Sequence, residues 1–374
     1  MNLKQFIIDK AKELNIDLIG FTDCEPLDDL KDYLIMRKLK NMEIEFEEKD
    51  IEKRINPKLI LPSCKTIIVI AMSYNNDFNY VSEYELKGKV SRSSWGLDYH
   101  VVLEDRLEKL IMEIKKNKEF NYKYYVDTGP LIERELARKA GIGYYGKNCS
   151  IINDEYGSFI FIGYILTDID IPINSPILGS KCGDCNLCIK ACPTGALERP
   201  FRFNPKKCIS YLTQTKMDIP YELREKMGTS IYGCDICQLA CPKNKGVKKP
   251  NHKEFLPNKG YIDIKELLSM SNREFKKEYG SMAGAWRGKN ILKRNAIIAL
   301  GNIKNKNTLD LLIPLLEDAS PMIREYVAWA ILNIDFEFGR ELVEKQLKKE
   351  ENQLMKRKME NILNYYLTRI DNNY

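Results

Sequence analysis

The sequence predicts a multidomain α+β protein, and three observations lead to that expectation. Strands and helices alternate over the first 175 residues, eight cysteines crowd into residues 182–241, and the chain beyond residue 250 has helical periodicity. With 374 residues, 44% of them hydrophobic, the chain is long enough to bury several cores. We therefore expect an α/β domain at 1–175, a metal-binding domain at 176–250 and an all-α domain at 251–374.

The expected elements of the first domain follow from apolar periodicity. Continuous β-branched and apolar runs predict buried strands, whereas apolar positions three and four residues apart predict helices with one buried face. The expected strands lie at 18–21, 66–72, 122–126 and 158–166. The expected helices lie within 1–20, at 98–116 and at 131–140, and Gly141 is placed to end the last one.

Eight cysteines form the most specific motif in the chain. Residues 182–193 read C-x2-C-x2-C-x3-C-P, the spacing of bacterial ferredoxins, in which the fourth cysteine ligates a neighbouring cluster. The second run, at 234–242, lacks one cysteine of that pattern, and Cys208 lies upstream to replace it. We therefore predict a ferredoxin-like domain with two [4Fe-4S] clusters. One cluster is assigned Cys182, Cys185, Cys188 and Cys241, and the other Cys192, Cys208, Cys234 and Cys237.

A structural zinc ribbon is the main alternative for these cysteines, because it also uses paired C-x2-C motifs. Zinc takes four ligands and has no use for the third cysteine at the same spacing or for the trailing C-P. Disulfides are disfavoured because the N-terminal residues do not have the pattern of a secretory signal. The three remaining cysteines, Cys24, Cys64 and Cys149, are expected to be single buried thiols.

Charge is distributed unevenly along the chain. The net charge is +6, but residues 243–307 contain sixteen Lys or Arg and five Asp or Glu. A basic block of this kind is typical of proteins that bind a polyanion such as nucleic acid. A solvated, lysine-rich surface is the alternative. Since no apolar run is long enough to span a membrane, we expect a cytoplasmic protein with no membrane partner.

The C-terminal domain contains a short internal repeat. Residues 296–303 resemble residues 327–334 at an offset of 31, with the same pattern of small and apolar positions and the same asparagine. This indicates HEAT-like repeats, although the period is shorter than usual. Two copies bury little surface alone, so we expect them to dock on the cluster domain. The alternative is an unrelated pair of amphipathic helices.

Asp127 is the candidate catalytic residue. It follows an aromatic strand and precedes Pro130 at the expected entrance to a helix, where an aspartate is commonly an N-cap or Asx-turn residue. The functional alternative is a proton donor whose pKa is raised by burial in a dry pocket. The two histidines, His100 and His252, are expected to be ordinary core or surface residues, so a further cofactor has to bind without a histidine ligand.

Residues 280–295 are the candidate nucleic-acid contact. Small residues allow a close backbone approach, a tryptophan offers a stacking face, and the adjacent cations can contact phosphates. A cationic loop between helices is the alternative. With two lysines upstream, the expected contacts are Lys276, Lys277, Trp286, Arg287, Lys289, Lys293 and Arg294.

Taken together, these motifs resemble those of the epoxyqueuosine reductase family. The resemblance covers nearly the whole chain in the right order. Besides both cysteine runs, it is carried by residues 91–100 (SRSSWGLDYH), 127–130 (DTGP), 140–148 (AGIGYYGKN), 208–213 (CISYLT), 286–289 (WRGK) and 294–296.

The resemblance implies a fold and an activity. It implies an N-terminal cobalamin-binding α/β domain, a two-cluster ferredoxin-like domain and C-terminal HEAT-like repeats that bind tRNA. It implies an oxidoreductase that reduces epoxyqueuosine to queuosine at the wobble position of tRNA, the last step of queuosine biosynthesis. Asp127 matches the proton donor of the family, an external electron donor is required, and a monomer is expected. The cofactor contacts carried over to this chain are Arg54, Ser91, Arg92, Ile151, Ser210 and Asp235.

Two other functions stay open on the residues alone. A reductive dehalogenase-like enzyme shares cobalamin and two clusters but fits poorly with a basic helical tail. A ferredoxin-type electron carrier with a HEAT-like interaction module would need neither cobalamin nor a pocket at Asp127.

Overall fold

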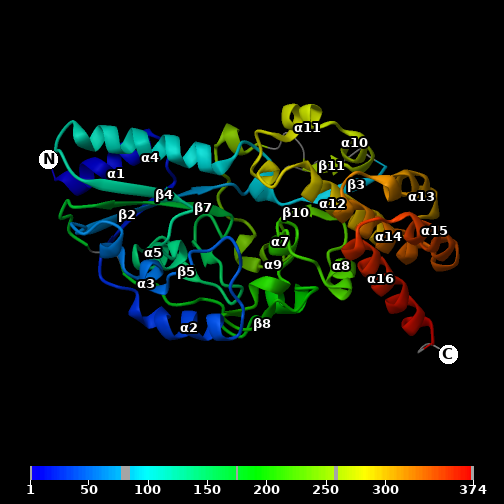
Figure 1. The fold of residues 1–374 in the computed structure, drawn as a ribbon. Helices are drawn as coiled ribbons and strands as arrows, with labels where there is room; N and C mark the ends of the chain where they lie inside the picture. Colours follow the sequence, from blue (N-terminus) through cyan, green and yellow to red (C-terminus); the bar gives the residue numbers. More distant parts are fainter. Residues whose placement is uncertain (1, 77–84, 174–175, 257–259, 372–374) are drawn as a thin grey trace. The chain divides into compact units, whose positions relative to one another are not determined.

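The structure is a computed structural model that describes residues 2–371 except 77–84, 174–175 and 257–259. The chain forms two compact units built from interleaved segments (Figure 1). Unit 1 comprises Met1–Asn79, Arg92–Cys208 and Asp235–Asn258, and unit 2 comprises Tyr80–Ser91, Ile209–Cys234 and Lys259–Tyr374. The first predicted domain boundary falls at residue 175, outside the described residues, and the three-domain division stays a prediction. None of the helices in the described part of the chain combines the length and apolarity needed to cross a membrane.

Unit 1 is organised around a four-stranded sheet in the order β1-β2-β7-β4, in which every pairing is antiparallel. The strands are β1 (Leu18–Asp23), β2 (Thr66–Ser73), β4 (Tyr122–Val126) and β7 (Ile160–Thr167). The main helices are α1 (Leu3–Glu13), α2 (Lys31–Leu39), α3 (Ile51–Ile55), α4 (Tyr99–Lys115) and α5 (Glu133–Lys139). Smaller elements are β5 (Tyr144–Tyr145), β6 (Ile151–Ile152), α6 (Leu187–Ala191), β8 (Leu197–Arg199), β9 (Arg202–Phe203) and α9 (Ile236–Leu239). The predicted mixed α/β character is confirmed.

Helices cover both faces of this sheet, which explains why β2 is apolar at every position (Figure 1). Ile68, Ile70 and Met72 lie in one core with α1 and α4, whereas Val69 and Ala71 lie in a second core with α5. Successive side chains of a strand point to opposite faces. A strand covered on both sides therefore has no polar alternation, as the sequence predicted.

The helix after Asp127 differs from its expected bounds. It begins at Glu133 rather than 131, so Asp127 is not its N-cap. Its end is as predicted, because Gly141 adopts a φ of 76° and donates to Arg138 O, while Ile142 N donates to Ala137 O. This pair of hydrogen bonds is a Schellman motif, which glycine favours at the left-handed position.

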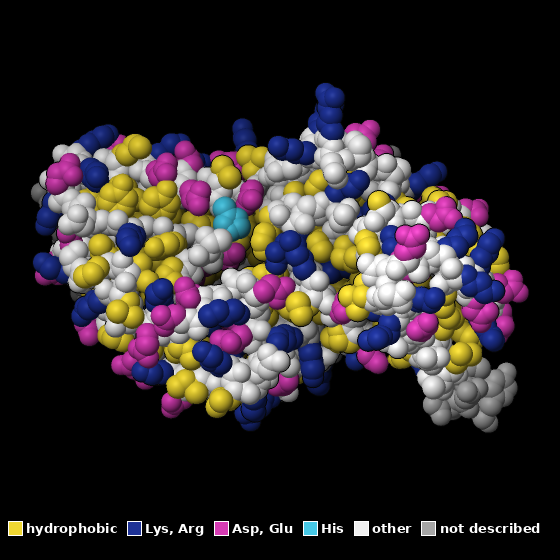
Figure 2. Space-filling model, in the orientation of Figure 1, with side chains coloured by type: hydrophobic (Ala, Val, Ile, Leu, Met, Phe, Trp, Pro, Cys, Tyr) yellow, Lys and Arg dark blue, Asp and Glu magenta, His cyan; other side chains and the backbone are white. Residues whose placement is uncertain are grey.

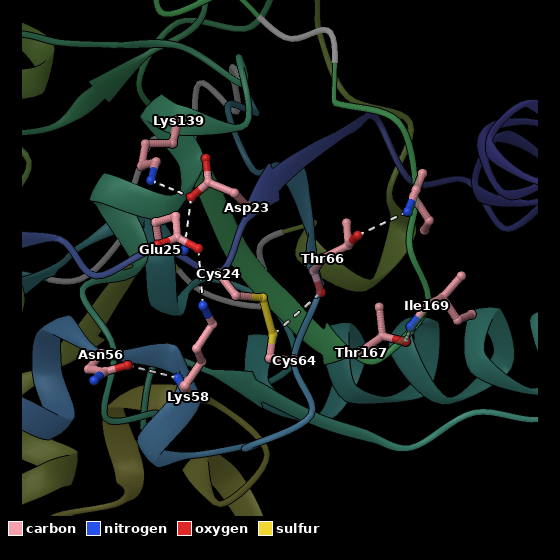
Figure 3. The surroundings of a disulfide bond; sticks show 11 residues. Asp23, Cys24, Glu25, Asn56, Lys58, Cys64, Thr66, Lys139, Thr167 and Ile169 are labelled. Atoms are coloured by element: carbon pink, nitrogen blue, oxygen red, sulfur yellow. Dashed lines mark hydrogen bonds and ion pairs between the residues drawn. A yellow bond between two sulfur atoms is a disulfide. The ribbon is translucent and has the colours of Figure 1, made fainter.

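Two cysteines expected to be single thiols form a disulfide instead. Cys24 follows β1 and Cys64 precedes β2, and their Cα atoms lie 6.1 Å apart (Figure 3). Because β1 and β2 pair antiparallel, with Asp23 opposite Thr66, the two strand ends bring the sulfurs together. Periodicity along the chain could not show this pairing. The third, Cys149, is a free thiol, as expected.

Unit 2 contains a small sheet and a helical array. The sheet has the order β10-β3-β11, formed by β3 (Lys87–Val90), β10 (Ser230–Tyr232) and β11 (Tyr261–Asp263). The helices are α7 (Ile209–Leu212), α8 (Tyr221–Lys226), α10 (Ile264–Ser269), α11 (Asn272–Tyr279), α12 (Lys289–Ile303), α13 (Leu309–Leu312), α14 (Pro321–Ile334), α15 (Phe336–Lys349) and α16 (Gln353–Asp371).

The predicted repeat corresponds to α12 and α14, which pack against each other. The repeated asparagine makes the same kind of hydrogen bond in both copies, because its side-chain nitrogen donates to backbone carbonyls of an element earlier in the chain. Asn333 donates to Gly301 O at 3.0 Å, and Asn302 donates to Arg224 O and Gly228 O, both at 2.9 Å. The first copy thus docks on residues 224–228, which belong to the predicted cluster domain.

Gly301 is the tightest point of this packing. A Cβ there would lie 2.7 Å from Cζ3 of the fully buried Trp329 and 3.2 Å from Cα of Ala330. We predict that Gly301→Ala lowers the free energy of unfolding by about 1–3 kcal/mol, because the indole has no room to move. Gly179→Ala is the matched control, since nothing lies within 4 Å of a Cβ at that position. Equal chemical-denaturation curves for both variants would contradict the packing described here.

Candidate functional site

Asp127 occupies a tight turn at the end of β4. Its φ of 57° lies in the left-handed region, and Thr128 N donates to Val126 O at 2.6 Å across it. A three-residue turn around a non-glycine residue at positive φ is rare and costs on the order of 1–3 kcal/mol. Such strain concentrates at functional sites, and it directs this carboxylate away from the sheet.

The turn is held down by close packing at Gly129. A Cβ at that position would lie 2.2 Å from the Tyr164 hydroxyl and 2.7 Å from Cβ of Tyr125. Only glycine therefore fits between the turn and the tyrosines of β4 and β7. This is the physical reason for the third residue of the DTGP motif.

His100 is the main site residue that sequence reasoning missed. It lies in the first turn of α4, where Asp98 is the N-cap and accepts from both His100 N at 3.0 Å and Nδ1 at 2.7 Å. The other ring nitrogen, Nε2, lies 3.6 Å from Oδ2 of Asp127. The imidazole thus bridges two carboxylates. The available signal was the aspartate two residues before one of only two histidines.

Tyr99 supports this arrangement from the side. Its ring stacks on Phe161 of β7 at 4.2 Å and on the His100 imidazole at 4.1 Å. Aromatic stacking of this kind fixes ring planes as well as burying surface. The imidazole is therefore oriented by a core strand and not by solvent.

Asp98, His100 and Asp127 form a hydrogen-bonded and charged group, here called the His100 array. Its charges oppose the predicted rise in the pKa of Asp127. Desolvation acts to raise the pKa of Asp127, but His100, Tyr99 and the more distant Arg134 outweigh it, so the pKa lies below its ordinary value. The expectation of a raised pKa in a dry pocket is therefore wrong, and 61% of the side chain is exposed. Desolvation lowers the pKa of His100, yet the two carboxylates overcome this and raise the pKa to about 10. At neutral pH the proton resides on the imidazole.

Two predicted cofactor contacts meet directly. Arg92 N donates to Oδ2 of Asp235 at 2.7 Å, and its guanidinium donates to Oδ1 of Asn75 at 2.6 Å and lies 4.9 Å from the Phe159 ring. Burial and then the negative charge of Asp235 raise the pKa of Tyr74, and the opposing effects of Gln238 and Arg134 do not reverse this shift. Asp235, Tyr74, Arg134 and Asp127 thus share one electrostatic environment within unit 1.

The other predicted cofactor contacts are more scattered. Arg54 forms an ion pair with Glu47 at 2.8 Å, and Glu47 is also held by Arg37 at 2.9 Å. Ile151 is buried in β6. Ser91 and Ser210 belong to unit 2, where the Ser210 carbonyl accepts from Thr213 and Gln214.

Four of the predicted cluster ligands interact electrostatically. Cys182 and Cys241 pack in one apolar group with Tyr144 and Ile152. Burial raises the pKa of Cys188 and of Cys241, and neighbouring thiolates, Cys182 among them, add to both shifts. Cys185 acts on Cys241 in the same way. These four cysteines are the ones that the sequence assigns to the first cluster, and that assignment stays a prediction.

The cysteines predicted to hold the second cluster are Cys192, Cys208, Cys234 and Cys237. Desolvation acts to raise the pKa of Cys192, but hydrogen bonds from Thr194 and from the backbone of residues 194, 196 and 197 lower it overall. Such N–H groups around a thiolate are typical of iron–sulfur ligation. Cys208 precedes α7, Cys234 follows β10, and Cys237 lies in α9. Within the described residues, no three His, Cys, Asp or Glu side chains are arranged to hold a single metal ion.

The candidate nucleic-acid residues divide into two groups. Trp286 is 54% exposed, donates to Oε1 of Gln214 at 3.0 Å, and lies 4.1 Å from the Arg287 guanidinium. Lys276 and Lys277 are exposed in the last turn of α11. Figure 2 shows Lys and Arg side chains interspersed with acidic ones on the face drawn.

The second group is buried, which corrects part of the prediction. Arg294 has no exposed surface and donates to Thr215 O at 2.6 Å and Leu212 O at 2.8 Å. Lys293 is buried and pairs with Asp318 at 2.6 Å. Both belong to the packing of α12, so neither is retained as an RNA contact. Lys289 is half-buried, and its ammonium donates to Met270 O at 2.7 Å.

The pKa of His100 gives a direct test of the array. We predict that NMR titration of the His100 ring gives a pKa near 10, and that Asp98→Asn lowers it. Because the pKa in the folded state exceeds the reference value of 6.5, the stabilisation is fully present below pH 6.5 and is lost as pH rises to about 10. A His100 pKa near 6.5 would contradict the array.

Three family models match consecutive parts of the chain. "Epoxyqueuosine reductase QueG, DUF1730" matches residues 54–128, the "4Fe-4S double cluster binding domain" matches 181–244, and "HEAT repeats" matches 289–362. The second match confirms the prediction of two iron–sulfur clusters over a zinc ribbon. The third confirms the HEAT-like repeats over an unrelated pair of helices.

Relatives along the whole chain agree. The chain is 44% identical to an epoxyqueuosine reductase of Bacillus cereus over 94% of both proteins, and 43% identical to that of Bacillus subtilis over 96% of this chain and 94% of the relative. A crystal structure of epoxyqueuosine reductase with an epoxyqueuosine-modified tRNA-Tyr stem loop matches with a TM-score of 0.91 and 42% identity, covering 97% of this chain and 98% of the other. The chain belongs to the epoxyqueuosine reductase family.

Proposed function

We propose that this chain reduces epoxyqueuosine to queuosine in tRNA. Family membership supports the activity, and the solved relative bound to an epoxyqueuosine-modified stem loop supports the substrate. The observation that carries the proposal is the proton-bearing His100 held between two carboxylates in a chain that also has a double-cluster domain. Neither a dehalogenase nor a simple electron carrier accounts for a tRNA-binding family.

The reaction defines what the protein must supply. Opening an epoxide to an alkene consumes two electrons and two protons and releases water. Iron–sulfur clusters pass electrons one at a time, so an external one-electron donor has to fill them. The chain's own residues must bind the nucleoside, exclude water and move the protons.

Cobalamin is the proposed second cofactor, and the residues present fit it. When bound, it supplies a strongly nucleophilic cobalt that can accept the electrons of the clusters and react at carbon. The side-chain nitrogens of Asn75 and Asn148 are buried without partners among the described residues, and amide carbonyls and a phosphate are suitable acceptors for them. Both histidines already have carboxylate partners, since His100 contacts Asp98 and Asp127, and Nε2 of His252 lies 2.7 Å from Asp17. The cofactor would therefore be held by residues other than histidine. We propose that residues 1–175 hold this cofactor.

Asp127 and His100 are proposed to act as one acid. The carboxylate, the more exposed of the two, faces the incoming oxygen, while the imidazolium stores the proton. As negative charge develops on the departing oxygen, Asp127 delivers a proton that it takes from His100. Asp98 keeps the imidazole oriented, and solvent returns the proton to His100 after product release.

The tRNA is proposed to bind through basic residues of unit 2, of which Lys276 and Lys277 are exposed and Arg287 is half-buried. Trp286 and Arg287 form a stacked pair suited to an unstacked base and a phosphate, and Lys276 and Lys277 add charge nearby in sequence. The modified nucleotide has to leave its stack to reach the chemistry. A tRNA substrate supports activity in the cytoplasm.

Asp127→Asn should abolish turnover while leaving the clusters intact. The amide keeps the shape of the side chain but cannot pass a proton, so we expect a loss of roughly 100-fold or more. The assay is mass spectrometry of tRNA nucleosides after incubation with reduced, reconstituted protein. Visible spectra of the variant control for cluster and corrin content. Turnover near the wild-type rate would show that Asp127 is not the donor.

Arg287→Glu should weaken tRNA binding and reduce its dependence on salt. Loss of one phosphate contact lowers the slope of log K against log[salt] by about 1. Lys345→Glu is the matched control, because it makes the same charge change at an exposed site on α15. Filter binding over a range of salt concentrations measures both variants. Equal weakening by the two substitutions would point to net charge alone.

A further inference from the structure

Glu133 is an acid with a buried carboxyl oxygen, and the proposed mechanism leaves it unused. It is the first residue of α5, six positions after Asp127. Its Oε1 atom is buried and has no hydrogen-bond partner among the described residues. One carboxylate oxygen that is buried without a partner makes the ionised form costly, whereas the protonated form tolerates such a site. The geometry therefore favours a carboxylic acid.

The neighbouring charges act in the same direction. Burial is the main reason that the pKa of Glu133 lies well above its ordinary value, and the negative charge of Asp127 raises it further. A hydrogen bond from the Asp127 backbone and the positive charges of Arg134 and His100 oppose this without reversing it. Burial and the neighbouring charge of Asp127 therefore both favour the protonated form of Glu133.

Tyr164 lies on the strand beneath this acid. Its hydroxyl is buried without a partner in the part of the chain that the structure describes. Burial is the main reason that the pKa of this tyrosine is raised, so it stays neutral. The same hydroxyl abuts Gly129 in the turn that carries Asp127. The acid, the tyrosine and the turn therefore form one packed group.

The proposed reaction needs two protons, whereas the His100 array stores one. We propose that Glu133 is a positioning residue and proton reserve for Asp127. After Asp127 has given up the first proton, Glu133 passes its proton to the Asp127 carboxylate, which leaves Glu133 ionised and Asp127 protonated. No electrons move in this step, and solvent restores the proton on Glu133 after product release. This role rests on the proposed reductase activity.

Infrared spectroscopy tests the proton directly and needs no substrate. We expect the reconstituted protein at neutral pH to show the carbonyl stretch of a protonated carboxylic acid, with a shift in D2O. The stretch should disappear in Glu133→Gln and persist in Glu135→Gln. Glu135 is the matched control because it is buried on the same helix but pairs with Arg138. A stretch that survives Glu133→Gln, or that is absent from wild type, overturns the proposal.

Single-turnover kinetics test the role. Glutamine keeps an oxygen that can accept from the Asp127 backbone but carries no acidic proton, so Glu133→Gln should slow product formation by roughly 10- to 100-fold. Glu133→Asp should recover part of that rate, and Glu135→Gln should match wild type. Loss of the infrared band with an unchanged rate overturns the proton reserve. Wild-type protein without turnover would contradict the reductase proposal, while the infrared result would still decide where the proton is.

Discussion

The antiparallel pairing of β2 with β7 is the constraint on which unit 1 depends. Eight residues of each strand are in register, from Thr66 opposite Thr167 to Ser73 opposite Ile160. Helices cover both faces of this pair, so its backbone groups have no water to bond and must bond each other. β4 pairs with the far side of β7 and ends at Val126, which places the Asp127 turn at the edge of the core. The stacking of Phe161 with Tyr99 ties the start of α4 to the same strand.

The chemistry follows from that placement. Two elements far apart in sequence each deliver one half of an acid–base pair, the imidazole from α4 and the carboxylate from the turn after β4. A single carboxylate at an exposed turn would simply be ionised. Asp127 instead lies beside an imidazole that Asp98 already holds. It can take a proton from His100, whose pKa is raised to about 10. The acid of this site is therefore the pair, and neither residue alone explains it.

In unit 2 the basic character of the sequence has two different origins. Part of it is structural, since the buried guanidinium of Arg294 bonds backbone carbonyls at 212 and 215, and Lys293 pairs with Asp318. These contacts fix α12 to the layer before it, next to the asparagine bonds of the repeat. Only the cations left on the surface are available to a polyanion. A local charge count therefore overstates the binding surface, because it cannot separate buried cations from exposed ones.

The sequence by itself determined the strands, the double-cluster domain, the repeat and the family, because each depends on spacing along the chain. Periodicity reports which face a residue shows, and C-x2-C spacing reports a metal-binding loop. The tertiary structure determined the features that residue spacing does not report, namely contacts between distant positions and the burial of individual side chains. The Cys24–Cys64 bond and the contact of His100 with Asp127 join positions that are distant in the sequence. The burial of Arg294 hides a charged side chain from solvent. The pKa of Asp127 was mispredicted for the same reason, since it is set by groups that only the fold brings near.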